Sequence, residues 1–252
     1  MQIDLSGKSV LVTGAGRGIG AAIARGMASA GARVAVHYGK SAEAAERLAA
    51  EIGGGAEAFA ADLARPMEAE GLWRAVRERF GRVDVLVNNA GIAVASPLDQ
   101  PTEDWVRDWD ATMAVNLTAA AVLCREAVRD FARQGAGRIV NIASRAAFRG
   151  DTPEYMAYAA SKAGLVALTR TIARGFGKTG VTAFVVAPGF TRTEMAQDFI
   201  DRYGEAFAVN DLALARLTEP EDVAPTVVFL ASGLADHATG SVVDINAGSY
   251  VR

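Results

Sequence analysis

Cysteine is almost absent from this chain of 252 residues, because Cys124 is the only one. One cysteine excludes an internal disulfide and any zinc site built from several thiolates, and we predict no metal site. An excess of positive charge is missing as well: 26 lysines and arginines stand against 29 aspartates and glutamates, a formal net charge of −3. Because nucleic-acid-binding domains present basic patches, we predict no nucleic-acid partner.

Long apolar runs and targeting signals are also missing. No run approaches the roughly 20 apolar residues that a membrane-spanning helix needs, and residues 1–8 lack the charged and apolar regions of a signal peptide. In contrast, 51% of the residues are hydrophobic and 22% are charged. This balance supplies a sizeable core and excludes a disordered chain. We therefore predict a globular, cytoplasmic protein without a membrane partner.

Short β-prone runs alternate with longer stretches of helical period. Strands that are apolar throughout, each followed by a helix, predict a parallel sheet covered on both faces. The fold class is therefore α/β, with one doubly wound Rossmann-fold domain over residues 1–252 and about seven parallel strands. Strands are expected at 9–12, 33–37, 56–61, 83–87, 139–142, 181–186 and 242–245. Helices are expected at 21–27, 42–52, 67–80, 103–134 (bent near 110–112), 156–176 and 221–231.

One long segment of mixed character, residues 190–218, does not fit this alternation. Pro188-Gly189 precede it and Glu219-Pro220 follow it. Long connections inside compact domains are usually functional or mobile. We predict that this segment forms a lid over a substrate site.

A glycine-rich turn, Thr-Gly-Ala-Gly-Arg-Gly-Ile-Gly at residues 13–20, falls between the first expected strand and helix. Glycine allows a tight turn there and lets a pyrophosphate approach the helix N-terminus, where N–H groups and the helix dipole favour an anion. Glycines also serve ordinary turns, so the strand–turn–helix context carries the prediction. A dinucleotide is predicted to bind at Gly14, Gly16, Arg17, Gly18, Ile19 and Gly20.

The end of the second expected strand bears on the choice of dinucleotide. An NAD site usually places an acidic residue there to hold the ribose 2′-hydroxyl, but residues 37–41 are His-Tyr-Gly-Lys-Ser. Cations and hydroxyls suit a 2′-phosphate, although Arg17 and Lys40 could equally be solvated surface charges. We predict NADP(H), with NAD(H) as the alternative. The residues placed at the cofactor are His37, Tyr38, Lys40 and Ser41, with His37 placed by position only because nothing in the pattern partners its ring.

Tyr158 and Lys162 stand four residues apart in an expected helix and therefore share one face. A phenol normally titrates near 10, but an adjacent ammonium favours the phenolate. The spacing thus predicts a lowered pKa for Tyr158, which would make it a proton donor and acceptor. Ser144 follows the fifth expected strand, at the sheet edge where such folds bind ligands. A Tyr/Lys pair alone also arises by chance on amphipathic helices.

These motifs occur together and in order, and in them the sequence resembles the short-chain dehydrogenase/reductase family over essentially the whole chain. Within the family it is most similar to 3-oxoacyl-[acyl-carrier-protein] reductases and related carbonyl reductases. The resemblance implies hydride transfer between NADP(H) and a carbonyl or secondary-alcohol substrate. An NAD-dependent alcohol or sugar dehydrogenase of the same family, and a nucleotide-sensing regulator without turnover, are the alternatives. The residues that carry the resemblance are Thr13-Gly14-x-x-x-Gly18-x-Gly20, Asp62-Leu63, Asn88-Asn89-Ala90-Gly91, Asn116, Ser144, Tyr158-x-x-x-Lys162 and Pro188-Gly189-x-x-x-Thr193.

The resemblance also implies roles for these residues. Tyr158 would be the general acid for reduction and the base for oxidation, and Lys162 would lower its pKa and hold the nicotinamide ribose. Ser144 would hydrogen-bond the substrate oxygen, and Asn116 would anchor a water that continues the proton relay. The other cofactor contacts would be Asp62 and Leu63 at the adenine, Asn89, Ala90 and Gly91 along the adenosine ribose, and Pro188, Gly189, Thr191 and Thr193 toward the nicotinamide.

Several of these residues have simpler interpretations. Asn88 and Asn89 could cap a loop, Asn116 could bend a helix, and Asp62 could be an N-cap. In the expected substrate region, Arg145, Arg149 and Arg192 would suit a substrate with an acidic group, although solvated loop charges are the simpler interpretation. The resemblance further implies a homotetramer or dimer built through helices 103–134 and 156–176. Thr179 stands where those reductases tend to carry an arginine that docks the carrier protein, which leaves docking open.

Overall fold

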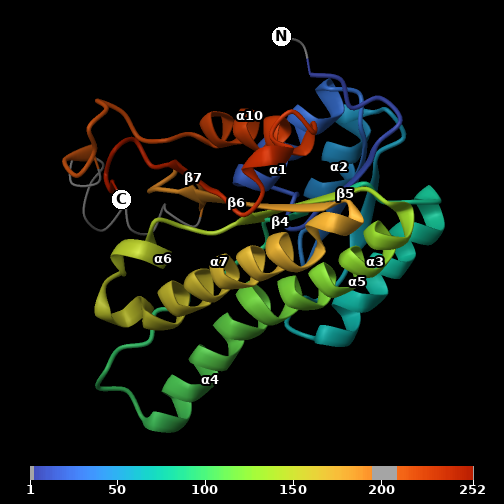
Figure 1. Cartoon of the computed structure of the whole chain (residues 1–252). Coiled ribbons are helices and arrows are strands. Elements are labelled where there is room, and N and C mark those ends of the chain that lie inside the picture. The colour runs from blue at the N-terminus through green and yellow to red at the C-terminus, as the bar shows by residue number, and fades with distance from the viewer. Residues whose placement is uncertain (1–2, 195–208, 252) are drawn as a thin grey trace.

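The computed structural model describes residues 3–194 and 209–251. Seven strands form one sheet in the order β3-β2-β1-β4-β5-β6-β7, and every neighbouring pair is parallel (Figure 1). The prediction of an α/β doubly wound fold is confirmed. The strands are β1 (Ser9–Val12), β2 (Arg33–Tyr38), β3 (Glu57–Ala60), β4 (Val85–Asn88), β5 (Gly137–Ile142), β6 (Val181–Pro188) and β7 (Val242–Ile245).

Helices cover both faces of this sheet (Figure 1). Helices α1, α2 and α10 pack on one face and α3, α5 and α7 on the other. Short 3-10 turns connect some elements at Pro153–Tyr155, Gly177–Thr179 and Asp236–Ala238. The helices are α1 (Gly18–Ser29), α2 (Ala42–Ile52), α3 (Pro66–Phe80), α4 (Thr102–Met113), α5 (Ala119–Gln134), α6 (Ala146–Arg149), α7 (Met156–Phe176) and α10 (Pro220–Ala231).

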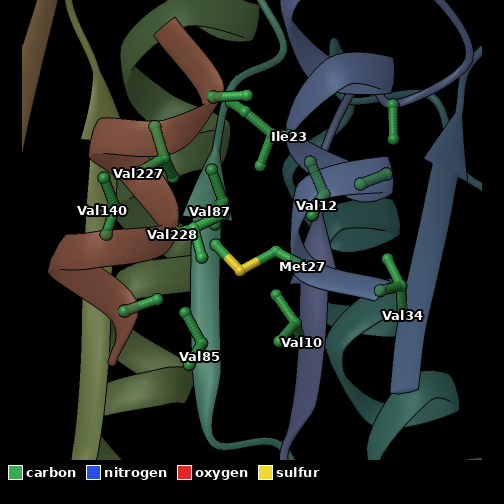
Figure 2. Close-up of a cluster of buried hydrophobic side chains, with 14 of the residues drawn as sticks. Val10, Val12, Ile23, Met27, Val34, Val85, Val87, Val140, Val227 and Val228 are labelled. Carbon is green, nitrogen blue, oxygen red and sulfur yellow. The ribbon is translucent and has the colours of Figure 1, made fainter. Parts of the chain in front are cut away.

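The apolar runs of the sequence are explained by burial on both faces of the sheet. In β1, Val10 and Val12 point to the side of α1 and α10, while Leu11 between them points to the side of α3 and α5. Figure 2 shows Val10 and Val12 beside Ile23 and Met27 of α1. All five side chains are fully buried. A strand buried on both faces needs apolar residues at every position rather than at every second one.

The predicted helix at 103–134 is one continuous helical stretch with a local widening. In place of the break or bend expected near 110–112, the structure has a π-helical turn at Ala114–Thr118 between α4 and α5. By length and composition alone, Thr102–Gln134 could cross a membrane, so the prediction that no segment approaches this character is corrected. Leu123 and Phe131 of this stretch are fully buried in the core beside α3 and α7, as in the core helix of a globular domain.

Candidate active site

The predicted site residues gather at the carboxyl ends of the central strands. From β1 the chain moves outward through β2 and β3, and it then returns to β4 on the other side of β1. Ligands of doubly wound sheets bind in the crevice at such a switch point. The segments that follow these strands here are the glycine-rich turn after β1, Asn89–Gly91 after β4 and Ser144 after β5.

The glycine-rich turn has a backbone that larger residues would not adopt. Gly14 and Gly18 have φ values of +61° and +51°, a region that favours glycine. A Cβ atom at Gly20 would lie 2.2 Å from the Gly14 oxygen and 2.5 Å from Asn89 Nδ2. Arg17 stands at the N-cap of α1 and makes no capping hydrogen bond, so the first N–H groups of this helix are left for an anion.

Asn89 joins the glycine-rich turn to the loop after β4. Its Nδ2 donates to the main-chain oxygens of Thr13 (2.9 Å) and Gly14 (3.1 Å). The Thr13 hydroxyl oxygen accepts hydrogen bonds from the N–H groups of Asn89 (2.9 Å) and Ala90 (3.0 Å). The side chain of Asn89 therefore braces the two loops, which favours its simpler interpretation, while Ala90 and Gly91 extend from the same brace.

His37 supports the same turn from β2. Its buried ring accepts the Gly14 N–H at Nδ1 (2.9 Å), and Nε2 lies 3.1 Å from the Ala61 oxygen. Burial lowers the pKa of His37, so the neutral ring can accept at one nitrogen and donate at the other. The expectation that His37 lacks a partner is wrong. Because both partners are main-chain atoms, no side-chain motif could reveal them.

The end of β2 is open to solvent where a 2′-phosphate is predicted. Tyr38 is half-buried, whereas Lys40 and Ser41 are exposed just before α2. Arg17, the other predicted cation, pairs with Glu194, and the two side chains are 63% and 67% exposed. Arg17 therefore belongs to an exposed ion pair and is not an isolated surface charge.

Asp62 and Leu63 lie beyond β3. The Asp62 carboxylate accepts the N–H of Ala64 (3.1 Å) and pairs with Arg65 (3.5 Å), as expected for a residue that shapes a turn. The Leu63 side chain is buried in the core beside α3. Only its main chain can therefore meet a ligand there.

Ser144, Tyr158 and Lys162 are brought together above β5. The Lys162 Nζ lies 5.7 Å from the centroid of the Tyr158 ring and donates to the Ile142 oxygen at the end of β5 (2.9 Å). The Ser144 hydroxyl is hydrogen-bonded with the Tyr158 phenol, and its oxygen accepts the N–H of Ala146 (3.1 Å). The predicted catalytic groups thus form one cluster.

The pKa of Tyr158 differs from the sequence-based prediction. Burial raises the pKa of the Tyr158 phenol, and the hydrogen bond from Ser144 opposes this increase. Burial also lowers the pKa of Lys162 to about 8. The prediction that Lys162 lowers the pKa of Tyr158 is therefore wrong, because desolvation dominates and favours the neutral form of each group. Tyr158 consequently holds its proton at neutral pH.

Asn116 lies in the π-helical turn, fully buried beside the cluster. Its Oδ1 accepts the Ile92 N–H (2.8 Å), and its Nδ2 donates to the Ile92 oxygen (2.9 Å) and to Ser161 Oγ (3.0 Å). The Ser161 hydroxyl in turn donates to the main-chain oxygen of Tyr158 (2.7 Å). The two N–H groups of the Asn116 amide are thus used by protein atoms, whereas Oδ1 keeps a second acceptor position, and the water predicted at Asn116 stays a prediction. Ser161 was missed as a site residue, although its spacing of three from Tyr158 was a signal.

Gly91 leaves the space that Lys162 and Asn116 occupy. A Cβ atom at Gly91 would lie 3.2 Å from Lys162 Nζ and 3.3 Å from Asn116 Oδ1. These distances are tighter than most Cβ contacts in proteins, so a side chain here would displace one of the two groups. The glycine of the Asn-Asn-Ala-Gly motif therefore has a packing reason in this site.

A buried polar network lies beneath the cluster. Asn88 Nδ2 donates to Asn141 Oδ1 (2.8 Å), and Asn141 Nδ2 donates to Thr169 Oγ1 (2.7 Å). Asn88 thus links strands rather than capping a loop. Cys124 lies beside the two amides, and burial raises the pKa of its thiol to about 12. Cys124 is a buried, free cysteine.

The segment after β6 returns toward the glycine-rich turn. A Cβ atom at Gly189 would lie 2.7 Å from Asn246 Cα, and one at Gly18 would lie 3.3 Å from Thr193 Cγ2. Thr191 is buried and bridges to Thr218. Thr193, although distant in sequence, thus lies beside the turn that is predicted to bind the cofactor.

A family model described as enoyl-(acyl carrier protein) reductase matches residues 14–249, nearly the whole chain. The chain belongs to the short-chain dehydrogenase/reductase family. As a member of this family, it is an NAD(P)-dependent oxidoreductase. Among residues 3–194 and 209–251, no group of three His, Cys, Asp or Glu side chains could hold a metal ion.

Several relatives support this family assignment. D-threitol dehydrogenase of Mycolicibacterium smegmatis is 36% identical over 251 residues, covering 98% of this chain and 95% of the relative. The 3-oxoacyl-[acyl-carrier-protein] reductase FabG of Staphylococcus aureus is 38% identical over 247 residues, covering 97% and 98%. A crystal structure from Beutenbergia cavernae, provisionally assigned as an NAD(P)-dependent gluconate 5-dehydrogenase and holding NADP at low occupancy, superposes with a TM-score of 0.91 at 37% identity, covering 99% of each chain.

The substrate side of this short-chain dehydrogenase/reductase is described in part. The middle of the predicted lid, residues 195–208, lies outside the described residues. Arg145 and Arg149 both donate to Asp211, and Arg192 donates to Glu219 (2.9 Å). The Arg145 side chain is only 17% exposed, so the interpretation of a solvated loop charge is wrong for this residue.

Proposed function

We propose that this short-chain dehydrogenase/reductase transfers a hydride between NADP(H) and a small-molecule carbonyl or secondary alcohol, in the manner of a 3-oxoacyl-[acyl-carrier-protein] reductase. The observation that carries the proposal is the cluster of Ser144, Tyr158 and Lys162 at the carboxyl end of β5. In this proposal, residues 1–252 act as one dinucleotide-binding and catalytic domain. Residues 190–218 act as its lid.

The residues at the switch point fit a dinucleotide. Gly14 and Gly18 have left-handed backbones, and the N-terminus of α1 has no side-chain cap. At Gly16 a Cβ atom would have its nearest neighbour 3.7 Å away, so this position leaves room beside the turn. When bound, the cofactor supplies or accepts the hydride. The residues proposed to hold it are Gly14, Gly16, Arg17, Gly18, Ile19, Gly20, Tyr38, Lys40, Ser41, Asp62, Leu63, Asn89, Ala90, Gly91, Tyr158, Lys162, Pro188, Gly189, Thr191 and Thr193, with His37 supporting the turn.

In the proposed reaction, the side chains of the cluster manage a single proton. The Ser144 hydroxyl orients the substrate oxygen, and Tyr158 donates its phenolic proton to that oxygen as the carbonyl is reduced. The ammonium form of Lys162 then stabilises the resulting phenolate. In the oxidative direction, Tyr158 takes the proton from the alcohol. Asn116 fixes the loop after β4 against α7 through Ile92 and Ser161.

Preference for NADP(H) over NAD(H) rests on the end of β2. No acidic side chain occurs at residues 37–41, whereas Lys40 and Ser41 are exposed there. A 2′-phosphate would meet these two groups and Arg17, provided that Arg17 leaves Glu194. The NADP bound to the Beutenbergia cavernae protein supports this choice.

An NAD-dependent alcohol or sugar dehydrogenase is the second candidate, supported by the D-threitol and gluconate dehydrogenases among the similar proteins. A regulator without turnover is disfavoured because it would leave the cluster idle. The test is kcat/KM for reduction of ketones and oxidation of polyols, each with both nicotinamide cofactors. Equal or higher values with NAD(H) would overturn the cofactor preference. Ketone reduction that survives unchanged in Tyr158→Phe would overturn the mechanism.

We further propose a homodimer or homotetramer in the cytoplasm. An apolar groove of about 610 Å³ lies between α5 and α7, and Phe176 at its rim is 39% exposed. A second copy would bury this groove, as the family resemblance implies. Light scattering of Val128→Arg, compared with the wild type, tests it: a monomeric variant supports the groove as an interface, and an unchanged mass contradicts it. The groove is lined by Ala121, Cys124, Arg125, Val128, Arg129, Ala132, Leu168, Ile172 and Phe176.

A further inference from the structure

Two arginines converge on one carboxylate oxygen beside the proposed active site. The Nη1 atoms of Arg145 and Arg149 lie 2.9 Å and 2.7 Å from Oδ2 of Asp211. The arginine side chains are 17% and 38% exposed, and that of Asp211 is 49% exposed. Because two nearby guanidinium groups repel each other, this arrangement needs an anion between them. A carboxylate satisfies the planar donors of arginine particularly well.

This arginine pair belongs to the substrate side of the cluster. Arg145 directly follows Ser144, and its N–H donates to the Pro188 oxygen at the end of β6 (2.9 Å). After burial and the Ser144 hydrogen bond, the charge of the Asp151 carboxylate is a third influence on Tyr158, and it raises the pKa of the phenol. The same carboxylate interacts electrostatically with Arg145 and Arg149. The pair and the phenol therefore lie within electrostatic reach of the same carboxylate.

We propose that Arg145 and Arg149 bind the carboxylate of an oxo-acid or hydroxy-acid substrate, and that Asp211 holds the place of that carboxylate in this structure. The inference rests on the proposed function, because it names the substrate class for the same site. Exchange of one carboxylate for another leaves the charge of the arginine pair balanced. Asp211 is half exposed, so water can hydrate it once it is displaced. The alternative is that Asp211 permanently ties its segment to α6.

The test compares two substrates that differ only in charge, 5-oxohexanoate and its neutral primary amide. The measured quantity is the ratio of their kcat/KM values in the wild type, Arg149→Gln and Asp211→Asn. We expect the acid-to-amide ratio to fall about 10- to 100-fold in Arg149→Gln, because charge-assisted hydrogen bonds to the acid are lost. The ratio should rise several-fold in Asp211→Asn, because the competing carboxylate is neutralised.

The matched control is Arg79→Gln, which removes an arginine that pairs with Glu57 at the opposite end of the sheet. Its ratio should equal that of the wild type. A ratio unchanged in Arg149→Gln, or a ratio unchanged or lowered in Asp211→Asn, would overturn the proposal and show that Asp211 only ties its segment to α6. Circular dichroism establishes that each variant is folded. Should Arg149→Gln fail to fold, the Asp211→Asn ratio decides alone.

Binding without turnover separates this inference from the proposed function. Dissociation constants for the acid and the amide are measured by calorimetry with Tyr158→Phe in the presence of NADP⁺. Tighter binding of the acid, combined with no ketone reduction by the wild type, would overturn the proposed function alone. Equal binding of acid and amide, combined with ketone reduction by the wild type, would overturn this inference alone.

Discussion

The ammonium nitrogen of Lys162 lies 5.7 Å from the centre of the Tyr158 ring, one turn further along α7. Burial raises the pKa of Tyr158 and lowers that of Lys162 to about 8. Both groups are thus shifted toward neutrality, and Tyr158 retains its proton for reduction. Oxidation of an alcohol requires the phenolate and should therefore be favoured by alkaline pH.

The first prediction concerns Ser144, whose hydrogen bond opposes the effect of burial on Tyr158. In Ser144→Ala, burial acts without this opposition, so the pKa of Tyr158 rises further. The rise of kcat/KM for alcohol oxidation with pH, which follows deprotonation of Tyr158, should occur at higher pH than in the wild type. The rate should also fall by about 10²-fold or more. A pH–rate profile measures both effects. A rise in kcat/KM that stays at the same pH or moves to lower pH contradicts the role assigned to Ser144.

The second prediction concerns protein stability. The protonated form of Lys162 is buried at a cost, because its folded pKa of about 8 lies below the ordinary value of 10.5. Below pH 8 this cost is fully present, and it is relieved as the pH rises toward 10.5. Lys162→Met, which is similar in volume, should therefore raise the free energy of unfolding by about 1–3 kcal/mol at pH 7.

The advantage of Lys162→Met should shrink between pH 8 and pH 9.5 as the wild-type lysine loses its proton. Urea unfolding of both proteins, without cofactor, at pH 7 and at pH 9.5 measures the difference. A variant that is less stable than the wild type at pH 7 would show that the hydrogen bond to Ile142 outweighs the desolvation of the ammonium. Activity, in contrast, should be lost in the variant.

The third prediction addresses cofactor choice at Gly39. A Cβ atom there would have its nearest neighbour, the Ala61 oxygen, at 3.8 Å, so a side chain fits without strain. Gly39→Asp places a carboxylate where it can accept the ribose 2′-hydroxyl and repel a 2′-phosphate. The ratio of kcat/KM for NADPH to that for NADH should fall at least about 10-fold.

Gly39→Asn is the matched control, since it has the same shape without the charge. Its ratio should change much less than that of Gly39→Asp. Equal ratios in the two variants would mean that shape, rather than charge, acts at this position. A wild-type ratio already below one would contradict the predicted preference itself.

The fourth prediction separates two glycines in helices. Gly20→Ala would place its Cβ 2.2 Å from the Gly14 oxygen, so the turn must shift. We expect a loss of at least about 2 kcal/mol of unfolding free energy and a weakened affinity for NADPH. Gly71→Ala in α3 has no neighbour within 4 Å and should instead stabilise the protein by about 0.5–1 kcal/mol. Thermal unfolding and NADPH fluorescence titration test both variants.

The parts of the molecule that sequence predicts well are those encoded locally. The strand at 9–12, the helix at 42–52 and the helix at 156–176 coincide with β1, α2 and α7, because apolar runs and helical periods are local patterns. The first helix was expected at 21–27 but begins at Gly18. The last residues of the glycine-rich turn already form its first turn, which a composition rich in glycine conceals.

Contacts between distant segments were less predictable. His37 is held by main-chain atoms of two other segments, and Arg145 meets Asp211 across 66 positions of the chain. No local motif records either contact. The pKa of Tyr158 was mispredicted for a similar reason, since spacing along a helix shows which groups are neighbours but not how much water surrounds them.

The buried network of Asn88, Asn141 and Thr169 fixes the position of helix α7 along the sheet. Asn88 and Asn141 face each other at paired positions of β4 and β5, and Thr169 lies on α7 two helical turns beyond Lys162. Sliding α7 by one turn, about 5.4 Å, would strand the amide of Asn141 in the core without its partner. The position of Lys162 along the axis of α7 is thus fixed by buried polar groups that are not among the residues proposed to contact substrate or cofactor.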